Sequence, residues 1–193
     1  SGSAGISLAS ESSSVGLLTL SGNNTYTGVT SVNSGTLQVG DGGNAGFISG
    51  DIVNNATLQW NRSDATIYAG SISGSGGVKQ LGSGTLSLTG SHSYGGETIV
   101  SLGTLQIGNG GTTGAVAGSI VDNATVQWNR SDSTSYSGSI TGSGALKQLG
   151  SGMLSVTGSN SSTGNSRGWR RRSARLAARS AGDTQASGMG HST

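Results

Sequence analysis

The sequence predicts an all-β protein: a right-handed parallel β-helix, or solenoid, of about six or seven coils. Three observations predict it: a glycine-rich composition, apolar residues that alternate with polar ones, and a long internal repeat without gaps. Of the 193 residues, 37 are glycine, 31% are hydrophobic and only 9% are charged, and proline and cysteine are both absent. A folded chain of this composition forms short strands and tight turns around a thin core that repeats along an axis.

The same composition excludes several classes of protein. A formal net charge of +2 is low for a disordered chain, and the absence of cysteine excludes a disulfide scaffold and a cysteine-ligated zinc site. No apolar run is long enough for a transmembrane helix. Residues 1–166 carry four basic side chains against seven acidic ones, so this body lacks the basic clusters that bind phosphate, and we expect no nucleic acid partner.

The internal repeat has an offset of 68 residues. Trp60 recurs as Trp128, and the Asn-Arg-Ser-Asp run at residues 61–64 recurs at residues 129–132. A third copy begins at Gly152 and fades after Gly164. A gapless repeat indicates one structural unit that stacks on the next.

Within each unit the apolar residues alternate with polar ones. Leu37, Leu58, Leu86, Leu105 and Val126 lie in runs of this kind, and we expect their side chains to be buried. Dividing the unit by three predicts coils of roughly 22 or 23 residues. Equivalent residues of successive units should then lie three coils apart, about 14 Å, with each tryptophan packed on aliphatic residues of adjacent coils.

The repeat also suggests how the chain is divided. The expected segments are an incomplete preceding coil at residues 1–15, repeat units at 16–83 and 84–151, the start of a third unit at 152–166, and an arginine-rich tail at 167–193. Because Ser1 stands in mid-pattern, we expect the chain to be a fragment of a longer protein.

Residues 18–40 carry a run of motifs: Leu-Thr-Leu-Ser-Gly, then Asn-Thr-Tyr-Thr-Gly, then Thr-Ser-Val, then Gly-Thr-Leu. This run resembles the autotransporter-associated β-strand repeat, also called the passenger-associated transport repeat. Residues 86–108 carry it again. The departures are few: Val29 and Glu97 stand where the family often has glycine, and His92 replaces the asparagine equivalent to Asn24. In the third copy Ser162 takes the tyrosine place, and Arg167 stands where a strand aliphatic belongs.

The resemblance implies a surface protein of a Gram-negative bacterium, of the type V secretion class. Such proteins have a β-helical passenger and a C-terminal outer-membrane β-barrel, which would be the partner of this segment in the full-length protein. The passenger crosses the barrel unfolded, and a chain without cysteine has no disulfide to block that passage. The function expected is a non-catalytic stalk for secretion and surface display, or for release, with adhesion to a host surface or self-association as its outward role. The alternative is the scaffold of a passenger enzyme, a protease or a polysaccharide-degrading enzyme, whose active domain lies outside this segment.

Catalytic, cofactor and metal sites are not expected. His92 is interpreted as a turn or surface residue, and with His191 it makes neither a metal site nor a triad. The Gly-x-Ser-x-Gly spacing at residues 164–168 lacks the strand and helix of a nucleophile elbow. Asp64 and Asp132 occupy equivalent positions about 14 Å apart, too far for a carboxylate pair.

Two further groups of residues are assigned structural roles and no chemistry. Arg62 and Asp64 are interpreted as a solvated turn pair. Asparagines followed two places later by Ser or Thr are interpreted as turn residues that stack as ladders; they are Asn23, Asn55, Asn61, Asn123, Asn129 and Asn160.

The tail differs from the body in composition. Residues 167–193 carry six arginines against one aspartate. Three interpretations stay open: an out-of-frame translation product, a short basic amphipathic helix around Trp169 and Leu176, or an unstructured tail.

Overall fold

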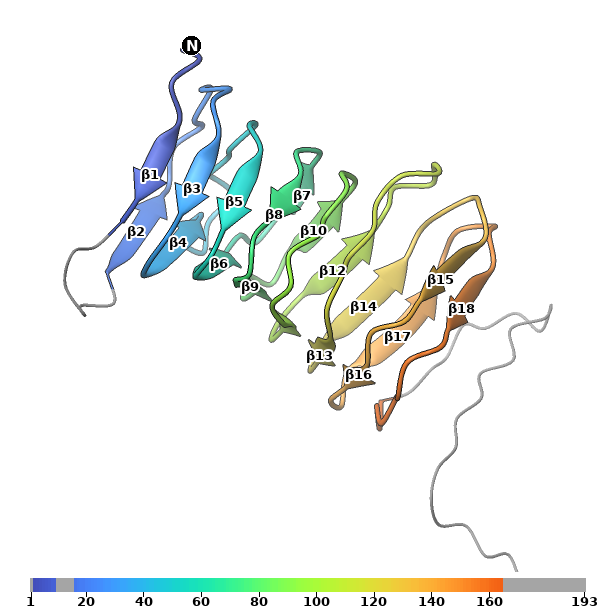
Figure 1. The fold of residues 1–193 in the computed structure, drawn as a ribbon. Helices are drawn as coiled ribbons and strands as arrows, with labels where there is room; N and C mark the ends of the chain where they lie inside the picture. Colours follow the sequence, from blue (N-terminus) through green and yellow to red (C-terminus); the bar gives the residue numbers. More distant parts are fainter. Residues whose placement is uncertain (1, 10–15, 165–193) are drawn as a thin grey trace, which may run out of the picture.

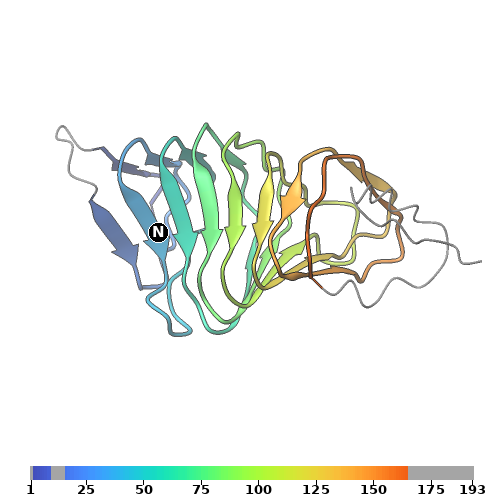
Figure 2. The same cartoon turned by 90° about the horizontal axis from the view of Figure 1, so that it is seen from below.

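The computed structural model describes residues 2–9 and 16–164, and in this part of the chain every regular element is a β-strand. Each strand pairs in parallel with a strand of the next coil, so that the chain winds as a solenoid (Figure 1). Seen from below, the strands lie side by side as successive rungs (Figure 2). The tail, with its three interpretations, and the Gly-x-Ser-x-Gly run from residue 165 onward lie outside the described residues.

Within residues 2–9 and 16–164 the strands form four parallel sheets. The first contains β1 (Ile6–Leu8), β3 (Thr30–Val32), β5 (Ile52–Asn54) and β8 (Ile72–Ser73). The second contains β2 (Leu17–Leu20), β4 (Thr36–Val39), β6 (Thr57–Trp60), β9 (Gly77–Gln80), β11 (Thr98–Val100), β13 (Ile120–Asp122) and β16 (Ile140–Thr141). The third contains β7 (Ala65–Tyr68), β10 (Thr85–Leu88), β12 (Thr104–Ile107), β14 (Thr125–Trp128) and β17 (Ala145–Gln148). The fourth contains β15 (Thr134–Tyr136) and β18 (Leu154–Val156). The seven-stranded second sheet gives about seven turns, so the predicted parallel solenoid and its size are confirmed.

The coil is shorter than the sequence predicts. Along one column of the second sheet the paired residues are Leu17, Thr36, Thr57 and Gly77. Three coils along this column therefore take 60 residues, about 20 each, and not the expected 22 or 23. In the first sheet the spacing falls from 24 to 22 to 20 residues, so within this sheet only the first coils reach the expected length. The strands are only two to four residues long and the turns between them are tight, which is why one circuit is so short.

The 68-residue unit is thus eight residues longer than three coils, and those residues carry the chain onto the next face. Trp60 lies on β6 in the second sheet, whereas Trp128 lies on β14 in the third. Likewise β2 and its repeat equivalent β10 lie in different sheets. The expectation that equivalent residues stand above one another about 14 Å apart is therefore wrong.

The core consists of apolar columns that run along the axis. Leu86 pairs with Leu105, and Leu105 pairs with Val126 in the next coil. The five residues expected to be buried are 0–1% exposed, which confirms the alternation on which the strand assignment rests. Because each column is one side chain wide, a residue in it depends on the coils directly before and after.

Polar side chains also stack from coil to coil. The Gln59 Nε2 donates to Gln38 Oε1 at 2.7 Å, and Gln127 Nε2 donates to Gln106 Oε1 at 2.8 Å. The suggested asparagine ladder is present at Asn55, whose Nδ2 donates to an asparagine oxygen of the preceding coil at 3.2 Å. These bonds satisfy amides that the stacking of strands brings together.

Asp122 is a fully buried carboxyl at a place where the first repeat has an asparagine. In the first repeat Asn54 Nδ2 donates to the Gly77 carbonyl at 2.8 Å, and its Oδ1 accepts from the Ala56 amide. Asp122 Oδ1 accepts in the same way from the Ala124 amide at 3.1 Å, but its Oδ2 has no hydrogen-bond partner. Burial raises the pKa of Asp122, because the charged form is desolvated.

We expect Asp122→Asn to stabilise the protein at neutral pH by roughly 1–2 kcal/mol, since an amide donates where a carboxylate cannot. Because the pKa of Asp122 is raised in the folded protein, the free energy of unfolding falls as the pH rises through the unfolded and then the folded pKa of this carboxyl. At a pH where the carboxyl is protonated in both states, Asp122 no longer destabilises the fold. The gain should therefore shrink in acid. Urea unfolding at pH 7 and pH 3 measures it, with Asn54→Asp as the reverse exchange; equal gains at both pH values would contradict the argument.

Candidate functional site: two arginine–aspartate clamps and an adjoining cleft

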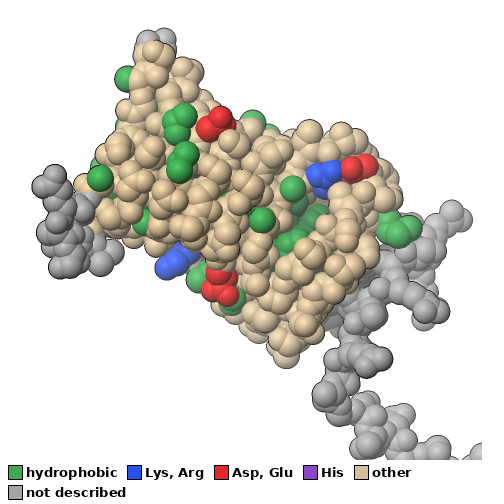
Figure 3. All heavy atoms as spheres, viewed as in Figure 1, with side chains coloured by type: hydrophobic (Ala, Val, Ile, Leu, Met, Phe, Trp, Pro, Cys, Tyr) green, Lys and Arg blue, Asp and Glu red, His purple; other side chains and the backbone are tan. Residues whose placement is uncertain are grey.

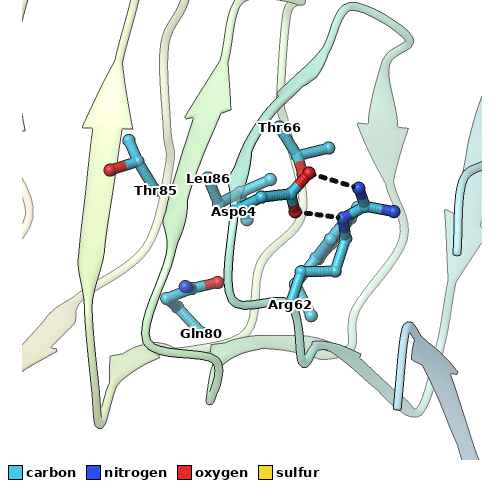
Figure 4. A pocket seen from close by; sticks show the side chains of 7 residues that line it. Arg62, Asp64, Thr66, Gln80, Thr85 and Leu86 are labelled. Carbon is cyan, nitrogen blue, oxygen red and sulfur yellow. Dashed lines mark hydrogen bonds and ion pairs between the residues drawn. The ribbon is translucent and has the colours of Figure 1, made fainter. Parts of the chain in front are cut away.

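Arg62 ties a loop of the preceding coil to the turn that follows β6. Its Nε and Nη2 donate to the two Asp64 carboxylate oxygens at 2.9 and 2.8 Å, as Figure 4 shows. Its Nη2 also donates to the Asn44 carbonyl at 2.6 Å, and its Nη1 donates to the Gly46 carbonyl. Both carbonyls belong to the glycine-rich loop between β4 and β5.

This arrangement corrects the interpretation of Arg62 and Asp64 as a solvated turn pair. The Arg62 side chain is only 11% exposed and that of Asp64 is 39% exposed. The loop folds back over the guanidinium because Gly46 has a φ of 97°, a left-handed conformation that glycine adopts without strain. Hydrogen bonds from Arg62 hold the pKa of the Asp64 carboxyl below its usual value.

We call this arrangement, an arginine bound to an aspartate two residues later and to two loop carbonyls of the preceding coil, a clamp. The second repeat has the same clamp. Arg130 Nε and Nη2 donate to Asp132 at 2.9 and 2.7 Å, Nη2 donates to the Thr112 carbonyl at 2.5 Å, and Nη1 donates to the Gly114 carbonyl. The two clamps precede strands of different sheets, because the repeat advances by one face. Asp64 and Asp132 are therefore held by separate arginines and are not brought together as a pair.

Glycines permit the close stacking of the turns that carry the clamp. A Cβ on Gly82 or on Gly84 would lie 2.0 Å from the carbonyl oxygen of Arg62 or Asp64, respectively. Any side chain at either position would push the two coils apart.

An aromatic pair lies beside each clamp. The Trp60 and Tyr68 ring centroids are 5.5 Å apart with the rings tilted at 53°, and Trp128 and Tyr136 are 5.5 Å apart at 57°. The expectation that the tryptophans pack on aliphatic residues is only partly right: Val39 is the strand neighbour of Trp60 on one side. The signal that could have revealed the aromatic pairing is the spacing of eight residues between Trp and Tyr in both repeats.

A pocket lies beside each clamp, and the two pockets differ in lining and in volume. The pocket beside the first clamp, drawn in Figure 4, has no room for a water molecule. Beside the second clamp there is an open cleft of about 270 Å³. The cleft is lined by Gly114, Ala115, Val116, Trp128, Arg130, Asp132, Ser133, Thr134, Ser135 and Tyr136. Figure 3 shows, at the C-terminal end of the described body, hydrophobic side chains in a hollow next to a basic and an acidic side chain.

His92 is not the turn or surface residue that the sequence suggested. It forms a parallel bridge with Ile72, is 4% exposed, and lies with its ring stacked 6.0 Å from the Tyr68 ring. The register with Ile72 turns its side chain into the core. Neither ring nitrogen has a hydrogen-bond partner, and desolvation lowers the pKa of His92 to about 4. His191 lies outside the described residues.

The described residues contain no group of three or more His, Cys, Asp or Glu side chains placed to hold a metal ion. No helix among them has the length and apolar character needed to cross a membrane.

Two segments of the chain match a known family model, and a longer segment is similar to a curated protein. The family model described as the passenger-associated transport repeat matches residues 15–39 and 79–107. The chain carries passenger-associated transport repeats. A curated relative, the adhesin BmaC autotransporter of Brucella suis biovar 1 (strain 1330), is 36% identical over 157 residues. That alignment covers 70% of this chain and 5% of the relative, so the chain spans only a small part of the length of the relative. No solved structure matches.

The structure gives the tyrosine of the passenger-associated transport repeat a physical role. Tyr94 is fully buried, and its hydroxyl is 2.6 Å from Thr98 Oγ1 at the start of β11. In the first copy the hydroxyls of Tyr26 and Thr30 are 2.9 Å apart, at the start of β3. In both copies this bond fixes the turn that leads into the next strand.

Proposed function

We propose that this chain is a non-catalytic segment of an autotransporter passenger that supports secretion across the outer membrane and display on the surface of a Gram-negative bacterium. Its partner in secretion is the C-terminal β-barrel of the full-length protein. Its outward role is adhesion to a host surface or to other copies of itself. Both the passenger repeats and the similarity to the BmaC adhesin support this proposal.

The observation that carries the proposal is the coil-by-coil pairing. Every strand of the described body pairs with a strand 19–24 residues away, so that each coil folds on the coil before it. A chain that emerges from a pore can therefore gain backbone hydrogen bonds and buried apolar surface one coil at a time. Each added coil opposes backward sliding. A chain without cysteine also enters the pore free of disulfides.

Secretion is tested by placing residues 1–193 between a secretion signal and an outer-membrane translocator, and by measuring surface exposure with external protease. Leu105→Asp, at a fully buried site, should reduce display severalfold, because the coil containing β12 no longer folds outside. Leu102→Asp is the matched control: its side chain is 58% exposed in the same coil and should leave display unchanged. Equal display of both variants would contradict a contribution of coil folding to secretion.

Adhesion is tested with the same cells. Bacteria that display residues 1–193 should adhere to host-cell monolayers, or sediment together, more than bacteria that display the translocator alone. If neither differs, the outward role assigned to this segment is wrong.

A further inference from the structure

We propose that the cleft beside Arg130 and Asp132 binds a neutral saccharide of one or two sugar rings. This goes beyond display on the cell surface, because it assigns a ligand to one place in the solenoid. The cleft volume of about 270 Å³ lies just below the range for drug-sized ligands, and so it suits a smaller one.

The charge of the cleft argues against an ionic ligand. Arg130 is paired with Asp132, so the clamp is neutral as a whole. Four of the five guanidinium N–H groups are used by Asp132, Thr112 and Gly114, which leaves too few donors for the forked recognition of a phosphate or carboxylate.

The remaining lining suits a polyhydroxylated molecule. Ser133, Thr134 and Ser135 provide hydroxyl groups at the rim, and the Asp132 side chain is 36% exposed and can accept from a ligand hydroxyl. The apolar part is formed by Trp128 and Tyr136. Because these side chains are 3% and 6% exposed, a sugar would meet their edges, and we expect weak, millimolar binding.

The first repeat supplies an internal comparison. It retains the aromatic pair and the clamp, but Phe47 stands in place of Ala115 and Ile67 in place of Ser135. Phe47 is 37% exposed and Ile67 is 50% exposed, so the first repeat presents large apolar side chains where the second repeat has a small alanine and a serine hydroxyl. The second repeat thus combines open volume with hydroxyl groups on an otherwise shared frame.

The test uses the purified chain in solution, so its result does not depend on secretion or adhesion. Lactose, maltose, cellobiose and chitobiose are titrated to tens of millimolar while the indole N–H resonances are followed by NMR. At least one sugar should shift the Trp128 resonance, with the Trp60 resonance unchanged as the internal reference.

Variants taken from the first repeat locate the site. Ala115→Phe should weaken the response at least tenfold, and Ser135→Ile provides a second variant should the first disturb the fold. Ala69→Phe, at an exposed alanine of the first repeat, controls for the added ring. The proposal is overturned if no sugar moves Trp128, if Ala115→Phe and Ser135→Ile respond like the parent chain, or if methyl phosphate binds there more tightly than every sugar.

Discussion

Replacing Leu86 by aspartate is expected to open the coils around β10 while coils at the far ends of the solenoid stay folded. Leu86 is 1% exposed and stands between Thr66 and Leu105 in its column. The substitution removes a buried side chain and leaves an unpaired carboxylate in its place, at a local cost of about 4–5 kcal/mol. In a solenoid this cost is borne by neighbouring coils, because each coil contacts only those beside it.

Hydrogen exchange followed by mass spectrometry measures this effect coil by coil. Protection should be lost in β7, β10 and β12 and retained in β2, β4 and β16. Ile67→Asp on β7 is the matched control, since that side chain is 50% exposed and its substitution should change little. Loss of protection in all coils at once would show a single cooperative core and would contradict the one-dimensional description.

Replacing His92 by asparagine should remove much of the sensitivity of the protein to mild acid. The pKa of His92 is lowered to about 4, against about 6.5 in an unfolded chain, because the buried ring resists protonation. Above pH 6.5 His92 is neutral in both states and costs no stability. As the pH falls from 6.5 toward 4, the histidine of the unfolded chain becomes protonated while the buried ring stays neutral, so the free energy of unfolding falls. The loss amounts to about 3 kcal/mol.

An asparagine also suits the position for a structural reason. The third repeat has Asn160 there, whose Oδ1 accepts from the Ile140 amide at 3.0 Å and whose Nδ2 donates to the Gly158 carbonyl at 2.9 Å. The unfolding midpoint in urea, measured from pH 7 to pH 4, should fall steeply for the parent chain and less for His92→Asn. Ser93→His adds an exposed histidine and should leave the slope unchanged. Parallel profiles for the parent and His92→Asn would rule out His92 as the source of the slope.

The repeat in the sequence marked most residues of the candidate site, but it did not show how their side chains are arranged. The recurrence of Asn-Arg-Ser-Asp marked both clamps, but nothing in the four residues showed that a loop about 18 residues earlier folds over the guanidinium. Ala115, which stands where the first repeat has Phe47, lines the cleft together with Trp128 and Tyr136. Only the fold brings these three residues to one place. His92 was misjudged because its inward direction depends on its register with Ile72.

The sequence by itself determined the strands, the buried face of each strand, the parallel solenoid and the passenger-repeat family. These follow from local alternation and from a repeat without gaps, which leave little choice of fold. Only the tertiary structure decided that a coil takes about 20 residues, and therefore that 68-residue units advance from face to face. A sequence period counts residues between equivalent units and does not count turns. The number of turns depends on how tightly each corner closes, which is decided by backbone stacking between coils.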